Sequence, residues 1–354
     1  MSVKNMKITE IATPALIIDE EIFDTNLRLM AELCKNKLRP HFKSHKCPEI
    51  ALKQIAAGAK GMTCATIHEA EVLCANGVGD ILFANQIADP AKAQRLAVIA
   101  GKSKLTVCAE KYEELKLYSD AAVREGTEIN VYAEYNTGMN RMGVNTFEEV
   151  IALAEMMGNM PNLSFAGVQA YAGQLSHIPD NEERRMGAVE LENKMRTLRD
   201  MFAAKGITGF EISGGSTGTA AFKIDGGVYT EIQAGSYLCG DNNYGLCGLP
   251  YKQSLYVLTT VLGVHGNRVI TDAGVKSNSV DQGLPNVDGF PGASMELHEE
   301  HGLLEFADTG AVKFGGRMRY VPGHCCATMN MHDRVYFVRG DEVTRVVDVT
   351  ARGY

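Results

Sequence analysis

Long apolar stretches and dense basic runs are both missing from this sequence. No apolar run approaches the ~18–20 residues of a membrane span, and residues 1–10 have no signal-peptide core. The net charge is −8, and the sequence contains no long run of lysine and arginine. Both features argue against nucleic acid or an anionic membrane as the partner. We therefore expect a cytoplasmic protein that acts on a small molecule.

A disulfide framework is also missing. The nine cysteines are an odd number and are scattered from Cys34 to Cys326. This usage fits a reduced compartment, in which most cysteines serve as small buried apolar residues.

The order of apolar segments indicates the fold class. With 354 residues the chain exceeds the ~250–300 residues at which single cores usually stop growing. Eight strand-like segments alternate with helical patterns, which predicts a (β/α)8 barrel over residues 20–245. A doubly wound open sheet is the alternative, because periodicity cannot show closure. The predicted strands are 38–43, 61–66, 80–84, 104–108, 128–134, 163–171, 209–213 and 229–234.

The pattern changes after about residue 245. Segments there are β-branched and alternating, and Gly, Pro, Asn and Asp turns join them. This predicts a second, mainly antiparallel β domain over residues 246–354. The strand-like segment 13–18 precedes the barrel, so we expect residues 1–19 to join that domain.

The segment 39–46 reads RPHFKSHK and places a lysine between two histidines at a predicted strand end. In an extended chain His41, Lys43 and His45 share one face. Cationic neighbours, including Arg39, favour the neutral amine that captures a carbonyl, so Lys43 is a candidate Schiff-base lysine. The alternative is a basic surface loop.

A glycine-rich loop, SGGSTGT at residues 213–219, follows the seventh predicted strand. Barrels often bind phosphate at this point on backbone amides. The alternative is a flexible turn.

Two further strand ends carry candidate polar residues. Arg141 lies in a glycine-containing segment after the fifth strand and could bind an anionic oxygen, or form a surface salt bridge. Tyr171 ends the sixth strand and could donate or accept a proton, although tyrosines at strand ends more often only pack. His177 could contact a substrate hydroxyl.

The sequence PGHCC at residues 322–326 suggests a metal site. On a strand His324 and Cys326 would share a face and ligate one ion, with Cys325 pointing away. Only two ligands are evident locally, and an open shell suits a catalytic metal. The alternative is a buried cysteine beside a hydrogen-bonded histidine.

Together these motifs resemble the D-threonine aldolase and D-serine dehydratase family, which shares its pyridoxal-phosphate (PLP) barrel with alanine racemases. The resemblance runs from TPA at 13–15 to RG at 352–353. It implies a homodimer that uses PLP and a divalent metal, zinc or manganese. It implies that Lys43 holds the cofactor, that Arg141 meets the ring's phenolic oxygen or its nitrogen, and that His324 and Cys326 bind the metal. The other implied cofactor contacts are His41, Tyr171, Gly215, Ser216, Thr217, Gly218 and Thr219.

The implied substrate is a D-amino acid with a β-hydroxyl, and two reactions stay open. Family aldolases, which release glycine and an aldehyde, commonly present His-x-Asp at the metal. Family dehydratases, which release a keto acid and ammonia, present His-x-Cys, as here. The wording PGHC and a histidine six residues after Tyr171 are nearer the aldolases. A racemase or a non-catalytic PLP-binding protein would not need the pair His324 and Cys326.

Overall fold

The computed structural model describes residues 6–310 and 312–353. Residues 1–5, 311 and 354, which the sequence assigns to the β domain, lie outside the described residues. The chain forms two compact units. Unit 1 contains Ser44–Glu49, Ser236–Gly353 and the amino-terminal segment up to Leu29; unit 2 contains Met30–Lys43 and Ile50–Gly235. None of the helices in the described ranges combines the length and hydropathy that a membrane crossing requires.

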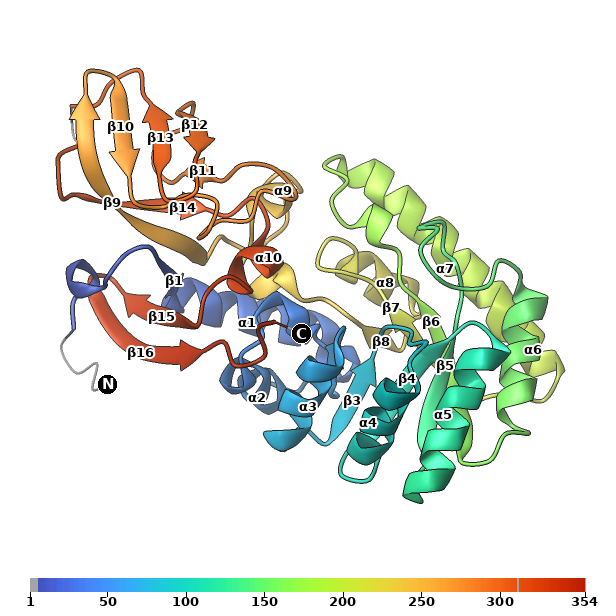
Figure 1. The fold of residues 1–354 in the computed structure, drawn as a ribbon. Coiled ribbons are helices and arrows are strands. Elements are labelled where there is room, and N and C mark those ends of the chain that lie inside the picture. Colours follow the sequence, from blue (N-terminus) through green and yellow to red (C-terminus); the bar gives the residue numbers. More distant parts are fainter. Residues whose placement is uncertain (1–5, 311, 354) are drawn as a thin grey trace. The chain divides into compact units, whose positions relative to one another are not determined.

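Unit 2 is built on a parallel sheet of seven strands in sequence order, which confirms the predicted TIM-like class (Figure 1). The segment after Lys37 completes the ring through isolated parallel bridges, Leu38 with Ile232 and His41 with Thr63. The first predicted strand, 38–43, is thus reduced to two isolated bridges. The strands are β2 (Met62–Cys64), β3 (Asp80–Phe83), β4 (Lys104–Ala109), β5 (Ile129–Glu134), β6 (Leu163–Ala170), β7 (Glu211–Gly214) and β8 (Glu231–Ile232).

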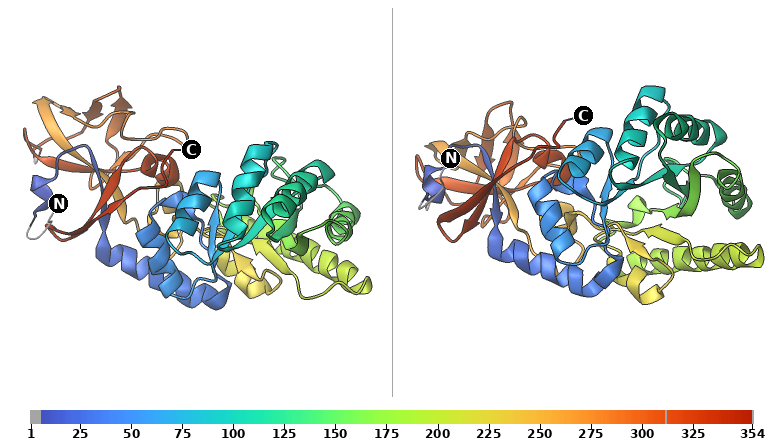
Figure 2. Two further views of the ribbon diagram at one scale, coloured as in Figure 1. Left: turned by 60° about the horizontal axis from the view of Figure 1, so that its bottom comes forward. Right: turned by 90° about the horizontal axis from the view of Figure 1, so that it is seen from below.

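Helices surround the strands of unit 2, as the right-hand view of Figure 2 shows. Local signals set their ends: Thr146 caps α6 by accepting from the Glu149 amide, and the Glu149 carboxylate accepts from the Thr146 amide. The helices are α3 (Ile67–Ala75), α4 (Pro90–Ala100), α5 (Tyr112–Glu125), α6 (Phe147–Met157), α7 (Asn181–Ala204) and α8 (Ala220–Gly226). Two more, α1 (Glu20–Cys34) and α2 (Pro48–Ala56), contain chain crossings between the units.

A buried ionic network lies at the amino-terminal ends of the barrel strands. Arg39 is 1% exposed and donates to Asp80 and Glu231, each at 2.7 Å. Lys60 Nζ lies 3.1 Å from the same Glu231. Asp80 and Glu231 are the first residues of β3 and β8. The expectation that Arg39 would act as a cationic neighbour of Lys43 is therefore wrong, because two carboxylates hold its guanidinium group.

Unit 1 contains a nine-stranded sheet in which β1 joins the carboxyl-terminal strands. β1 pairs in parallel with β15 and antiparallel with β9, and the other strand pairings described in unit 1 are antiparallel. Two short helices, α9 (Asn242–Gly245) and α10 (Cys325–Met329), belong to the same unit. The strands are β1 (Ala15–Asp19), β9 (Leu255–His265), β10 (Arg268–Thr271), β11 (Asn286–Val287), β12 (Ser294–Leu297), β13 (Gly302–Glu305), β14 (Arg317–Val321), β15 (Arg334–Arg339) and β16 (Glu342–Asp348).

Candidate active site

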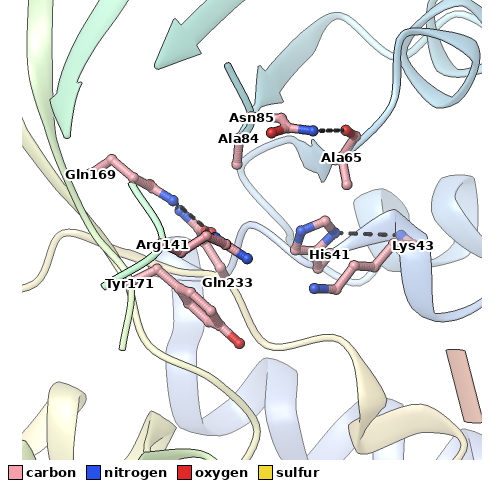
Figure 3. Close-up of a pocket in the computed structure, with 9 residues that line it drawn as sticks. All are labelled: His41, Lys43, Ala65, Ala84, Asn85, Arg141, Gln169, Tyr171 and Gln233. Atoms are coloured by element: carbon pink, nitrogen blue, oxygen red, sulfur yellow. Dashed lines mark hydrogen bonds between the residues drawn. The ribbon is translucent and has the colours of Figure 1, made fainter. Parts of the chain in front are cut away.

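A cavity of about 250 Å³ opens at the carboxyl-terminal ends of the barrel strands (Figure 3). Ala65, Ala84, Tyr171 and Gln233 each directly follow the last residue of a strand, which fixes the end of the barrel on which the cavity lies. This is the end at which TIM-barrel enzymes place their active sites. The lining residues are His41, Lys43, Ala65, Ala84, Asn85, Arg141, Gln169, Tyr171 and Gln233.

Lys43 enters the cavity from a turn of 3-10 helix, Phe42–Ser44, that follows the closing segment of the barrel. The prediction that His41, Lys43 and His45 share one extended face is wrong, because the extended backbone ends at His41. The Lys43 amide donates to His41 Nδ1 at 3.4 Å. The Lys43 amine lies 6.0 Å from the centre of the Tyr171 ring, and both side chains point toward the same space (Figure 3).

Arg141 reaches the cavity from the loop after β5. Its guanidinium carbon lies 6.0 Å from the centre of the Tyr171 ring. The loop folds back onto the strand, since the Val144 amide donates to the Glu134 carbonyl at 2.9 Å. Gly143 has φ +102, and an added Cβ would lie 2.5 Å from the Asn136 nitrogen, so this return requires glycine.

Glu134, the last residue of β5, is a buried acid near Arg141. Burial raises the pKa of Glu134 to about 7, against the lowering effects of the Gln86 hydrogen bond and the Arg141 charge. The carboxyl group is therefore partly protonated at neutral pH.

Two buried glutamines, Gln169 and Gln233, also line the cavity and were not predicted from the sequence. Gln233 Nε2 donates to Gln169 Oε1 at 2.6 Å and to Ser213 Oγ at 2.9 Å. In the sequence each of them is a single polar residue near the end of an apolar strand. The same pattern led to the prediction of Tyr171. They offer a bound ring neutral amide groups.

The glycine-rich loop at residues 214–219 follows β7 at the same end of the barrel. The backbone amide of Gln233 donates to the Gly214 carbonyl at 2.8 Å, which connects the loop to a residue that lines the cavity. An added Cβ on Gly218 would lie 2.1 Å from the Ser176 carbonyl oxygen, so any side chain there would clash with the Ser176 backbone. Ser176 Oγ is buried without a hydrogen-bond partner. Three loop hydroxyl groups are also buried, those of Ser216, Thr217 and Thr219.

The donors of unit 2 fit pyridoxal phosphate. The Lys43 amine suits an aldehyde and the Arg141 guanidinium group suits an anionic ring oxygen. The loop, with the Ser176 hydroxyl beside it, suits a phosphate. His177, a further candidate, is half-buried after the turn Gly173–Leu175, and it is not among the cavity-lining residues in the described part of the chain.

The candidate metal ligands lie in unit 1, and the local backbone differs from the prediction. His324 directly precedes α10 and Cys326 lies inside that helix, so the expected strand is wrong. The two side chains nevertheless hydrogen-bond to each other. Within the described ranges, no group of three or more His, Cys, Asp or Glu side chains forms a metal site.

Asp281 Oδ2 lies 2.7 Å from His324 Nδ1. Burial lowers the pKa of His324, but Cys326 and Asp281 outweigh it and raise that pKa to about 9. A carboxylate on one imidazole nitrogen is an arrangement that orients a zinc-binding histidine. The imidazole of His324 and the thiol of Cys326 are donor types that suit a divalent ion such as zinc.

Comparisons with known proteins cover nearly the whole chain. The family described as alanine racemase, N-terminal domain, matches residues 18–243, and the putative serine dehydratase domain matches residues 254–338. The chain is 37% identical to a D-threonine aldolase of an Arthrobacter species, over 98% of this chain and 94% of that protein. It is 34% identical to a 3-hydroxy-D-aspartate aldolase of Paracoccus denitrificans, with the same shares covered.

A solved structure is similar to this chain over nearly its whole length. The D-threonine aldolase from Filomicrobium marinum superposes with a TM-score of 0.96 at 32% sequence identity, covering 99% of this chain and 97% of that one.

Proposed function

Because the chain belongs to the D-threonine aldolase and D-serine dehydratase family of PLP-dependent lyases, we propose that it cleaves D-β-hydroxy amino acids to glycine and an aldehyde. The observation that carries the proposal is the cavity in which Lys43 and Tyr171 face each other beside Arg141. The 37% and 34% identities to two aldolases favour cleavage over elimination.

Lys43 would hold the cofactor's aldehyde carbon, Arg141 its phenolic oxygen, and the 214–219 loop its phosphate. When bound, PLP supplies an electron sink for the bond that breaks at Cα. Gln169 and Gln233 would border the ring without adding charge, because their side chains are neutral. The two side-chain amides hydrogen-bond to each other.

The proton steps belong to His177 and Tyr171. His177 would take the proton of the β-hydroxyl group, and the electrons of that O–H bond would form the aldehyde carbonyl as the Cα–Cβ bond breaks. Tyr171 would return a proton to Cα to complete glycine. Tyr171 lines the cavity, which suits this role. The role of His177 rests on the family resemblance, in which a histidine follows Tyr171 by six residues.

His324 and Cys326 would bind a divalent ion in unit 1, with zinc favoured by the thiolate and manganese as the alternative. Such an ion supplies a Lewis acid for the β-oxygen of the substrate. Asp281 would keep the His324 ring oriented. The protein would act as a homodimer, as the family resemblance implies.

Elimination to a keto acid and ammonia is the second candidate. The observation that favours it is Cys326 two residues after His324 within the match to the putative serine dehydratase domain. In that reaction a proton leaves Cα, the β-hydroxyl departs, and hydrolysis of the product releases ammonia.

Product analysis tests the proposal. The protein is incubated with D-threonine, D-serine and D-threo-3-hydroxyaspartate, and glycine plus aldehyde are assayed separately from keto acid plus ammonia. We expect glycine from D-threonine, no reaction of L-threonine, and loss of cleavage in His177→Ala. Ammonia release would favour elimination. Neither product from any substrate, or equal turnover of L-substrates, would refute the lyase and favour a racemase.

A further inference from the structure

Two cationic side chains lie fully buried behind the 214–219 loop, and none of the roles assigned above uses them. Arg184 from α7 is 0% exposed and Lys223 from α8 is 1% exposed. Burying a charge is costly unless the charge is paired and hydrogen-bonded. Both residues belong to unit 2, and both contact the loop.

Arg184 holds the far side of the loop. Its Nε donates to the Gly218 carbonyl at 3.0 Å, and other guanidinium nitrogens donate to the Ile178 carbonyl and to Asn181 Oδ1. The Gly218 carbonyl is thereby directed toward a cation. A carbonyl oxygen directed at a phosphate would repel it, so this contact orients the loop to accept an anion.

Lys223 lies behind Gly215. An added Cβ on Gly215 would lie 3.4 Å from Lys223 Cγ, so the lysine chain packs directly under the glycine backbone. The amine donates to the Ala188 carbonyl at 3.0 Å and lies 4.3 Å from the centre of the Tyr229 ring. The Tyr229 hydroxyl in turn donates to the Ala170 carbonyl, at the end of β6 beside Tyr171.

The charge of Lys223 is only partly compensated. Glu192 forms a long ion pair with it, with 3.8 Å between the amine and Glu192 Oε1. Burial lowers the pKa of Lys223 to about 8, against the raising effect of Glu192. The amine therefore remains mostly protonated at pH 7 and leaves positive potential behind the loop.

We propose that Arg184 and Lys223 are positioning residues that form a cationic backing for the 214–219 loop and make it select a phosphorylated cofactor over its unphosphorylated analogue. The inference rests on the proposed PLP function and deepens it. The backing acts through the loop, where Gly215 and Gly218 place no side chain between the cations and the backbone.

The test compares the affinities of the cofactor-free protein for pyridoxamine 5′-phosphate and for pyridoxamine, neither of which can bond covalently to Lys43. The ratio of the two dissociation constants reports the phosphate contribution alone. We define the phosphate preference as the dissociation constant for pyridoxamine divided by that for pyridoxamine 5′-phosphate. In Lys223→Met this preference should fall about tenfold, as expected for removing one charge from a low-dielectric site. The exposed control Lys116→Met should keep the wild-type ratio.

A second variant guards against misfolding of the first. In Glu192→Gln the partial counter-charge is gone, so the phosphate preference should rise. An unchanged ratio in both variants, with a clear preference in the wild-type protein, would overturn the cationic backing and leave the PLP proposal intact. A wild-type protein with no phosphate preference would instead refute the assignment of the loop itself.

Discussion

At the scale of single residues, the backbone around Lys43 decides which side chains can act. The turn of 3-10 helix Phe42–Ser44 directs Lys43 toward Tyr171, whereas an extended chain would have aligned it with His41 and His45. Residue type and position at a strand end were therefore sufficient to predict a residue that lines the cavity, Lys43. The wrong detail was the local backbone, because a turn of three residues leaves no periodic signal.

Glu134 should make the stability of the cofactor-free protein fall as pH rises. Its folded pKa of about 7 lies above the ordinary value of 4.5. The unfolded chain therefore loses this proton first, and folding stability declines between pH 4.5 and 7. Glu134→Gln should remove roughly 3 kcal/mol of that decline. Urea titrations at pH 5 and pH 8 measure it, and the same pH dependence in both proteins would contradict the assignment.

At the scale of elements, the closing segment of the barrel depends on the buried ionic network. Glu231→Gln leaves Arg39 with Asp80 alone, and breaking such a buried pair costs about 3–5 kcal/mol. Asp120→Asn is the matched control, since the pair Lys116–Asp120 is exposed on one helix and should lose at most about 0.5 kcal/mol. Urea unfolding compares the two variants. Equal small losses would mean that the network does not hold the barrel closed.

The glycine-rich loop should not tolerate a side chain at Gly218. Gly218→Ala places a Cβ against the Ser176 carbonyl, so the loop must move and cofactor affinity should fall more than tenfold. Gly79→Ala is the control, because an added Cβ there has open space around it. Cofactor titration followed by visible absorbance measures both. Unchanged affinity in Gly218→Ala would place the phosphate elsewhere.

The strand order and the β domain could be read from the sequence, because strands and helices carry different hydrophobic periods. The closure through Leu38 and His41 could not, since isolated bridges leave too little pattern. Gln169 and Gln233 were missed for a related reason: a single polar residue in an apolar strand does not reveal the partner to which it will hydrogen-bond. The pair His324 and Cys326 was chosen correctly as neighbours, for the wrong backbone reason.

At the scale of the whole molecule, the two units divide the proposed chemistry between cofactor and metal. Exhaustive chelation should abolish activity while the visible absorbance of the bound cofactor stays, because Lys43 and the loop belong to unit 2. Added zinc or manganese should restore turnover. Cys326→Ala should lose the metal, and Cys74→Ala in unit 2 should keep it, as metal analysis would record. Full activity of chelated Cys326→Ala would refute a catalytic metal.

The central claim is that the cavity around Lys43 is the catalytic centre, and reductive trapping tests it most directly. The protein with its bound cofactor is reduced with borohydride, digested, and mapped by mass spectrometry. We predict a pyridoxyl group on Lys43 and a folded Lys43→Ala variant that takes up none. A pyridoxyl group on Lys46, Lys276 or Lys313 in its place would contradict the account.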